Sequence, residues 1–90
     1  MITWGEAKRK KNLKDHGIDL AQLAAVFDAP LFTVEDERQP YGEQRLQSLG
    51  WFRDRVVFLV WTERVESARV ISCRYGDKHE TRYYFKALGF

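Results

Sequence analysis

Three arginines lie near the ends of two segments that are expected to be neighbouring β-strands. Residues 55–61 are β-branched, aromatic or aliphatic on both alternating faces, which is typical of a central strand covered on both sides. Arg64 follows that apolar run, and residues 68–74 repeat the pattern with Arg69 and Arg74 near the ends. An arginine side chain is planar, stays charged at any working pH and can pair with two oxygens of one phosphate. The rim of this hydrophobic sheet is therefore the predicted place for chemistry on an anion.

Other reactive residue types do not assemble into a familiar catalytic set. The single Cys73 lies in a predicted buried strand and forms no nucleophile–base triad with the two histidines. The acidic residues 35–37 lack a histidine or a second carboxylate cluster at ligand spacing, so neither a metal site nor a cofactor is expected. The arginines have a structural alternative, since they could pair across strands with Glu63, Glu66 or Asp54.

Two helices are predicted before the strands. Thr3 to Glu6 has the form of a capping box and starts a helix that runs to about His16, with Gly17 ending it. Asp19 starts a second helix. The apolar residues of this second helix follow amphipathic α-helical spacing and are Leu20, Leu23, Ala24 and Phe27.

The strands form a run between these helices and a third one. Residues 31–34 and 45–52 are two further predicted strands, separated by an acidic loop, and Arg53-Asp54 forms the turn into the central strand. A capping box from Asp77 to Glu80 starts a short helix through about Leu88. Sequential strands with short connections predict an antiparallel meander. The expected fold is therefore α+β, with the helices on one face: N-terminal helices packed on a four-stranded antiparallel sheet, and a short C-terminal helix. Residues 1–90 are enough for a single domain.

The net charge of +2 hides an uneven distribution along the chain. Residues 1–18 hold five Lys or Arg against two Asp or Glu, residues 19–43 hold one against six, and residues 44–90 hold nine against five. Lys8 and Lys11 share one face of the first predicted helix. Such a basic face is either a contact for nucleic-acid phosphates or ordinary solvated surface.

The sequence predicts a soluble, cytoplasmic protein with no membrane partner. The first residues turn polar too early for a signal peptide, and no apolar run approaches the roughly 18 residues of a membrane span. The lone cysteine cannot form an internal disulfide, which fits a reducing compartment.

A family resemblance rests on five stretches in order, followed by Glu80 and Tyr84: TWGEAKRKKNLKDHGI, AAVFD, YGEQR, RVVFLVWTER and RVISCR. Together they resemble the BrnT family of toxins from type II toxin-antitoxin pairs, within the RelE-like ribonuclease group. The resemblance implies a small bacterial endoribonuclease that cleaves RNA and inhibits translation, with helices packed on an antiparallel sheet. It also implies a BrnA-like antitoxin that neutralises the toxin and binds operator DNA, so that DNA is a partner only through the complex.

The chain departs from that family pattern near its end. Family members tend to read ISARKA and then a basic ER pair. The residues that differ here are Cys73, Tyr75 and Gly76 in the first motif and Thr81 in place of the arginine in the second. If that arginine carries catalysis, Lys78 or Arg82 is the obvious substitute.

The lack of metal ligands fits a ribonuclease, because RNA carries its own nucleophile, the 2′-OH. The protein then has to position the phosphate, stabilise charge on its oxygens and move protons. On this hypothesis Arg64 and Arg74 hold the scissile phosphate. The candidates for proton transfer are Glu63, His79 and Tyr84, although alternation puts Glu63 on the face opposite Arg64. The predicted RNA contacts are Lys8, Lys11, Lys14, Arg69, Lys78 and Arg82.

Two other interpretations stay open. One is a non-catalytic module that binds nucleic acid or another protein, which the absence of a strong acid–base pair favours. The other is a degenerate toxin retained for its complex with the antitoxin, which the threonine at position 81 favours.

Overall fold

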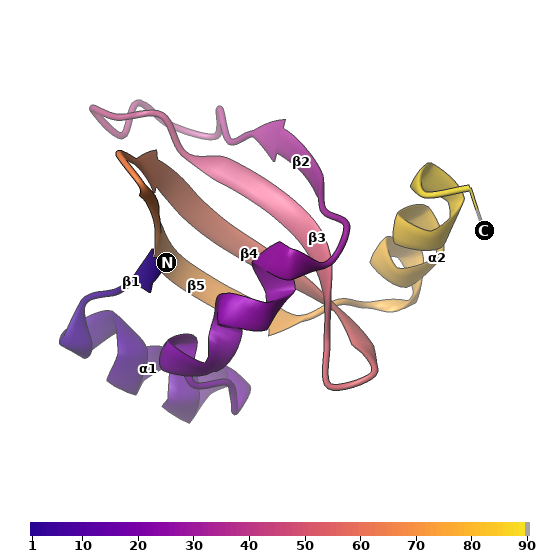
Figure 1. Cartoon of the computed structure of the whole chain (residues 1–90), viewed down its shortest axis with the longest axis horizontal. Coiled ribbons are helices and arrows are strands. Elements are labelled where there is room, and N and C mark those ends of the chain that lie inside the picture. Colours follow the sequence, from indigo (N-terminus) through magenta and orange to yellow (C-terminus); the bar gives the residue numbers. More distant parts are fainter. Residues whose placement is uncertain (90) are drawn as a thin grey trace.

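The computed structural model describes residues 1–89 and shows an α+β fold built on one five-stranded sheet (Figure 1). The elements in chain order are β1 (Ile2–Thr3), α1 (Glu6–His16), the 3₁₀ helix η1 (Leu20–Asp28), β2 (Phe32–Glu35), β3 (Leu46–Phe52), β4 (Arg55–Arg64), β5 (Ser67–Tyr75) and α2 (Lys78–Ala87). The strand order is β1-β5-β4-β3-β2, in which β1 is parallel to β5 and the other neighbours are antiparallel. The α+β class is confirmed. The four-stranded, wholly antiparallel RelE-like sheet is not matched, because β1 adds a parallel edge strand.

The capping box predicted at Thr3 is wrong. Thr3 belongs to β1 and lies opposite Arg69 of β5, so it stands outside the helix. Gly5 occupies the position before α1 and supplies no side-chain cap. The end of α1 is as predicted, since Gly17 adopts a left-handed conformation with φ 71° and donates its N–H to the carbonyl of Leu13.

The second helix has the tighter 3₁₀ geometry, with three residues per turn. Its fully buried residues are Leu20, Leu23 and Val26, which lie three apart and therefore share one face. The α-helical spacing expected for this segment is wrong. Ala24, which that spacing placed on the buried face, is exposed. Asp19 caps the helix as predicted, because its carboxylate accepts the N–H of Ala21.

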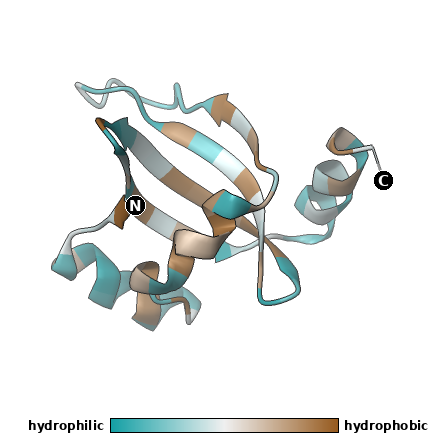
Figure 2. Ribbon diagram, in the orientation of Figure 1, coloured by the Kyte–Doolittle hydropathy of each residue, from teal (hydrophilic) through white to brown (hydrophobic). Residues whose placement is uncertain are grey.

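The central strand β4 is covered on both faces, as predicted. On one face Val57 and Leu59 pack with η1 in the larger core. On the other face Val56 packs with Leu49 and with Tyr84 of α2. Figure 2 shows hydrophobic residues along β4 and in η1, which lies over it. The expectation that all helices share one face is wrong for α2, because its apolar side finds the second hydrophobic face of β4.

Two backbone features decide which side chains of the sheet share a face. Arg53 and Asp54 take left-handed conformations, with φ of 51° and 60°, and form the predicted two-residue turn between β3 and β4. A register shift interrupts the pairing of β4 with β5. Because of this bulge Val70 and Cys73, three residues apart, both enter the larger core.

Asn12 is the buried polar residue that joins α1 to the sheet. Its Nδ2 donates to the carbonyl oxygens of Ile18 at 2.9 Å and Cys73 at 2.8 Å, and its Oδ1 accepts the N–H of Cys73 at 2.9 Å. Since β1 pairs with β5 only at Ala68 and Arg69, the amide takes the place of a neighbouring strand at Cys73. One side chain thus satisfies three buried backbone groups and fixes α1 against β5.

Replacing Asn12 should destabilise the whole domain. Asn12→Ala leaves three backbone groups without this partner, and each unsatisfied buried group costs about 1–3 kcal/mol, so we expect unfolding free energy to fall by about 3 kcal/mol or more. Urea denaturation followed by circular dichroism measures this. Leu13→Ala on the same helix is the control and should change stability by less than about 1 kcal/mol, because Leu13 is already 48% exposed. Equal denaturation midpoints for the two variants would contradict a stabilising role of the Asn12 hydrogen bonds.

The ion pair between Arg9 of α1 and Asp19, the residue that caps η1, should make the free energy of unfolding depend on pH in acid. Hydrogen bonds from Arg9, and then from the Ala21 N–H, lower the pKa of Asp19 from 3.8 to about 2. Because the folded pKa is the lower one, the contribution is complete above about pH 4 and is lost as the pH falls through about 2. We expect the Tm of the wild type to fall more steeply over that window than that of Asp19→Asn, which keeps a cap but does not titrate. Parallel curves from a calorimetric pH series would contradict this.

Candidate active site

The two arginines expected to share a phosphate lie at opposite ends of the β4–β5 pair. Arg64 pairs with Ser67, whereas Arg74 pairs with Phe58, six residues away from Arg64 along β4. At about 3.3 Å per residue this separates them by roughly 20 Å. The prediction that both arginines hold one scissile phosphate is therefore wrong. The carboxyl ends of two antiparallel neighbouring strands lie at opposite ends of the sheet.

Arg64 fastens the loop before β3 to the end of β4. Its guanidinium donates to the carboxylate of Glu43 at 3.0 Å and to the hydroxyl of Thr62 at 3.0 Å. Thr62 in turn donates to the carbonyl oxygen of Gln44 at 2.8 Å. Glu63 is exposed at this same end of the sheet. The surroundings of Arg64 are thus acidic, which disfavours the approach of a phosphate.

Arg74 makes a two-pronged contact with Glu80 in the first turn of α2. Its Nη1 and Nη2 donate to the two carboxylate oxygens at 2.8 and 2.9 Å, and its guanidinium lies 4.5 Å from the ring centroid of Phe58. The hydrogen bonds from Arg74 are the main cause that lowers the pKa of Glu80, and Glu80 raises the pKa of Arg74. Both groups are therefore held in their charged forms.

The chain between β5 and α2 positions this pair. Gly76 donates its N–H to the Val56 carbonyl at 2.8 Å, and a Cβ on Gly76 would lie 3.2 Å from Val56 Cγ1, so the turn needs a small residue. The capping box predicted at Asp77 is confirmed. Asp77 accepts the Glu80 N–H at 2.8 Å, while the Glu80 side chain accepts the Asp77 N–H at 3.0 Å. Glu80 is thus fixed from two directions.

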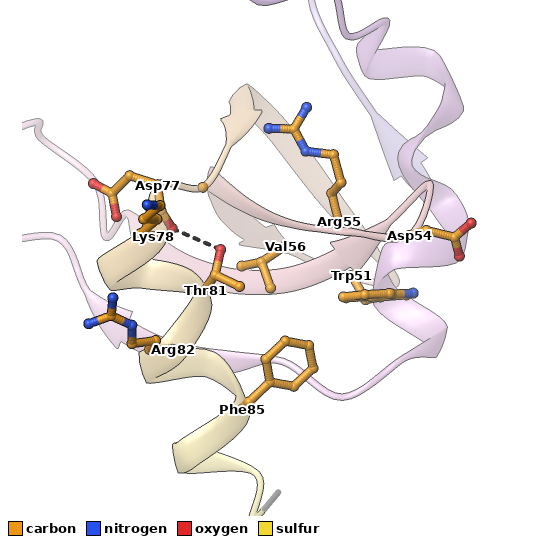
Figure 3. A pocket seen from close by; sticks show the side chains of 10 residues that line it. Trp51, Asp54, Arg55, Val56, Asp77, Lys78, Thr81, Arg82 and Phe85 are labelled. Atoms are coloured by element: carbon orange, nitrogen blue, oxygen red, sulfur yellow. Dashed lines mark hydrogen bonds between the residues drawn. The ribbon is translucent and has the colours of Figure 1, made fainter.

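A groove of about 600 Å³ lies beside α2 (Figure 3). It is lined by Trp51, Asp54, Arg55, Val56, Gly76, Asp77, Lys78, Thr81, Arg82 and Phe85. The hydroxyl of Thr81 donates to the Asp77 carbonyl at 2.8 Å, so this threonine completes the first turn of α2. Lys78 and Arg82, two of the predicted RNA contacts, come together at this groove.

The other predicted residues are spread over the molecule. Tyr84 is buried, burial raises the pKa of its hydroxyl, and that hydroxyl donates to the Pro30 carbonyl at 2.8 Å. His79 is exposed beside Glu80 on α2. Lys8 and Lys11 line a small cavity between α1 and β5, Lys14 is exposed in the last turn of α1, and Arg69 lies opposite Thr62.

Sequence reasoning did not select Glu80, Trp51 or Arg55 as site residues. Glu80 was assigned to a helix cap, and the structure shows that the same carboxylate also holds Arg74. Trp51 lies opposite Val56 across the turn at Arg53-Asp54, so the predicted turn was the signal that could have placed these two side chains together. Arg55 lies opposite Phe52, on the other face of the hairpin.

Within residues 1–89 no group of three or more His, Cys, Asp or Glu side chains could hold a metal ion. No helix in that part of the chain is long and apolar enough to cross a membrane.

A small α+β domain with an ionised arginine–carboxylate pair beside a cationic groove is suited to binding an anion such as a phosphodiester. A comparison with family models matches residues 4–80 to the BrnT toxin family, described as the ribonuclease toxin, BrnT, of type II toxin-antitoxin systems. The chain belongs to this family, which confirms the resemblance drawn from the sequence. It is thus a toxin of the ribonuclease type, and its class implies an antitoxin partner. No curated protein matches the chain.

Cys73 should behave as an inert core residue. It is buried, and burial raises the pKa of its thiol to about 12, so almost no thiolate forms at neutral pH. We expect iodoacetamide at pH 7.5 to label the folded protein at least about a hundredfold more slowly than the protein in urea, as read by mass spectrometry. Rapid labelling of the folded chain would contradict the burial of Cys73.

Proposed function

We propose that this chain is an endoribonuclease that needs no metal ion, with Arg74 and Glu80 at its centre. Its membership of the BrnT family supports RNA cleavage in general. The observation that supports this location of the active site is the two-pronged Arg74–Glu80 contact. It places a guanidinium, which can bind a phosphate, next to an ionised carboxylate. The Arg74 side chain is 39% exposed, so a phosphate oxygen can approach its outer side.

The reaction follows from the groups that RNA and the protein bring together. Glu80 takes the proton of the 2′-OH, and the freed oxygen attacks the adjacent phosphorus, giving a 2′,3′-cyclic phosphate. Arg74 stabilises the added negative charge on the phosphate oxygens. The bond from phosphorus to the 5′-oxygen breaks, and that oxygen takes a proton from His79, which is exposed on the same turn of α2. No step requires a metal ion.

Local charge favours Arg74 over Arg64 as the phosphate ligand. Arg74 is followed along the chain by two cationic side chains, Lys78 and Arg82, and by two acidic ones, Asp77 and Glu80. The acidic side chains Glu43, Glu63 and Glu66 lie around Arg64. An RNA strand is therefore attracted to the α2 end of the sheet.

The proposed partner is a BrnA-like antitoxin that covers the sheet face carrying Arg74. α2 packs against β3 and β4, so it shields only part of that face. A protein segment laid across the rest would exclude RNA from Arg74 and prevent the inhibition of translation. Operator DNA would then be bound only by the toxin–antitoxin complex.

The second candidate function is a binding module without catalysis. The observation that favours it is that both arginines already hold carboxylates, Arg74 with Glu80 and Arg64 with Glu43. Ion pairs of this kind occur in purely structural roles as well.

RNA cleavage in EDTA, with and without ribosomes, tests the proposal. Loss of one charge-stabilising contact commonly costs about a hundredfold in rate, so we expect that loss for Arg74→Ala. Glu80→Gln should lose at least as much, because it removes the base as well. Arg64→Ala is the matched control at the other end of the sheet and should stay within a fewfold of the wild type. Circular dichroism verifies that each variant is folded.

Two results would overturn the proposal. If Arg64→Ala abolishes cleavage while Arg74→Ala does not, the centre lies at the other end of β4. If the wild type cleaves nothing and Arg74→Ala instead weakens RNA binding steeply with salt, the chain is the binding module.

A further inference from the structure

The groove beside α2 has an apolar floor that the proposed cleavage does not use. Figure 3 shows Trp51 and Phe85 turned toward the same space, with the side chain of Val56, from β4, beside them. The ring centroids of Trp51 and Phe85 lie 5.7 Å apart in an edge-on arrangement. Trp51 is 36% exposed, so part of its ring is open to solvent. The floor therefore offers aromatic surface to a ligand.

The rim of the same groove is cationic. Lys78 and Arg82 lie four residues apart on one side of α2. Arg55 also lines the groove, but its guanidinium stacks on the ring of Tyr75 at 3.9 Å and points away from Trp51 and Phe85 (Figure 3). Of the two acidic residues at the groove, Asp77 is occupied as the cap of α2, and Asp54 points away from it (Figure 3). Positive charge around an aromatic floor matches a ligand that has both a flat ring and a phosphate.

We infer that this groove binds one nucleotide of single-stranded RNA, with its base against Trp51 and its phosphate at Lys78 and Arg82. The inference rests on the proposed function, because it assigns this nucleotide to the strand whose neighbouring phosphate lies at Arg74. The volume of about 600 Å³ falls within the usual range for a small-molecule site and leaves room for a nucleotide. Gly76 lines the groove two residues after Arg74, roughly 7 Å along the chain, so adjacent nucleotides can reach both places.

The chemistry of the groove predicts tolerance toward the sequence of the bound base. Every nucleobase has a face that stacks on an aromatic ring. Beside Trp51, the floor residues Val56 and Phe85 have hydrocarbon side chains, which cannot read a base edge through hydrogen bonds. The site thus holds the strand in place beside Arg74, while the identity of the base matters little.

A short 2′-O-methyl RNA tests the groove without being cut, because it lacks the attacking hydroxyl. Titration of the wild type should quench tryptophan emission as a base covers Trp51. Trp51→Phe should lose that quench but keep most of the affinity, as measured by anisotropy of a labelled oligonucleotide. Trp51→Ala should bind about tenfold more weakly. Arg82→Gln should also weaken binding, whereas Lys86→Gln, an equal charge change on α2 outside the groove, should weaken it less.

A series of oligonucleotides with one abasic position supplies the decisive comparison. Removal of one particular base should weaken binding to the wild type about tenfold and leave binding to Trp51→Ala unchanged, because that variant has no ring to stack on it.

The outcomes separate this inference from the proposed function. Unchanged binding by Trp51→Ala overturns the groove site, even if Arg74→Ala stops cleavage. Quenching by adenosine monophosphate at the same concentration as the oligonucleotide overturns the assignment to RNA and indicates a free nucleotide. If the wild type cleaves no RNA but Trp51→Ala still binds RNA more weakly, the groove site is supported and the proposed ribonuclease activity is rejected.

Discussion

The three hydrogen bonds of Asn12 are the constraint on which the arrangement of the domain depends. They tie the middle of α1 to Cys73 of β5 and to Ile18, the residue that leads into η1. α1 itself carries few apolar residues, so its position depends on this polar contact more than on packing. Because η1 follows directly, the same contact sets how Leu20, Leu23 and Val26 meet the sheet.

The candidate site lies at the same end of β5, directly after Cys73. Once the strand is fixed at Cys73, Arg74 is directed to the opposite face, where α2 brings Glu80 to it. The turn at Gly76 is packed and hydrogen-bonded against Val56, which places the start of α2 next to β4. The ion pair and the groove therefore share one origin, the short connection between β5 and α2.

Local patterns predicted local structure well, and long-range contacts decided the rest. The central strand, the turn at Arg53-Asp54 and the capping box at Asp77 were predictable because their determinants lie within a few residues. The pattern at Thr3 failed because a partner 66 residues away, in β5, pairs with it as a strand. The candidate site was only partly accessible from the sequence: the pattern indicated Arg74 as a candidate but not its distance from Arg64, which the antiparallel register fixes.

The parallel pairing of β1 with β5 also bears on the order in which the chain folds. Ile2 and Thr3 find their partners only at residues 68 and 69, and Asn12 finds Cys73 across 61 positions of sequence. Contacts of such long range form late, since the entropy of closing a large loop must be overcome first. During synthesis the segments up to β4 therefore emerge without the strand that locks α1 in place. The catalytic arrangement proposed for Arg74 and Glu80 cannot exist before that strand has been made, so the ribosome completes most of this toxin while it is still harmless.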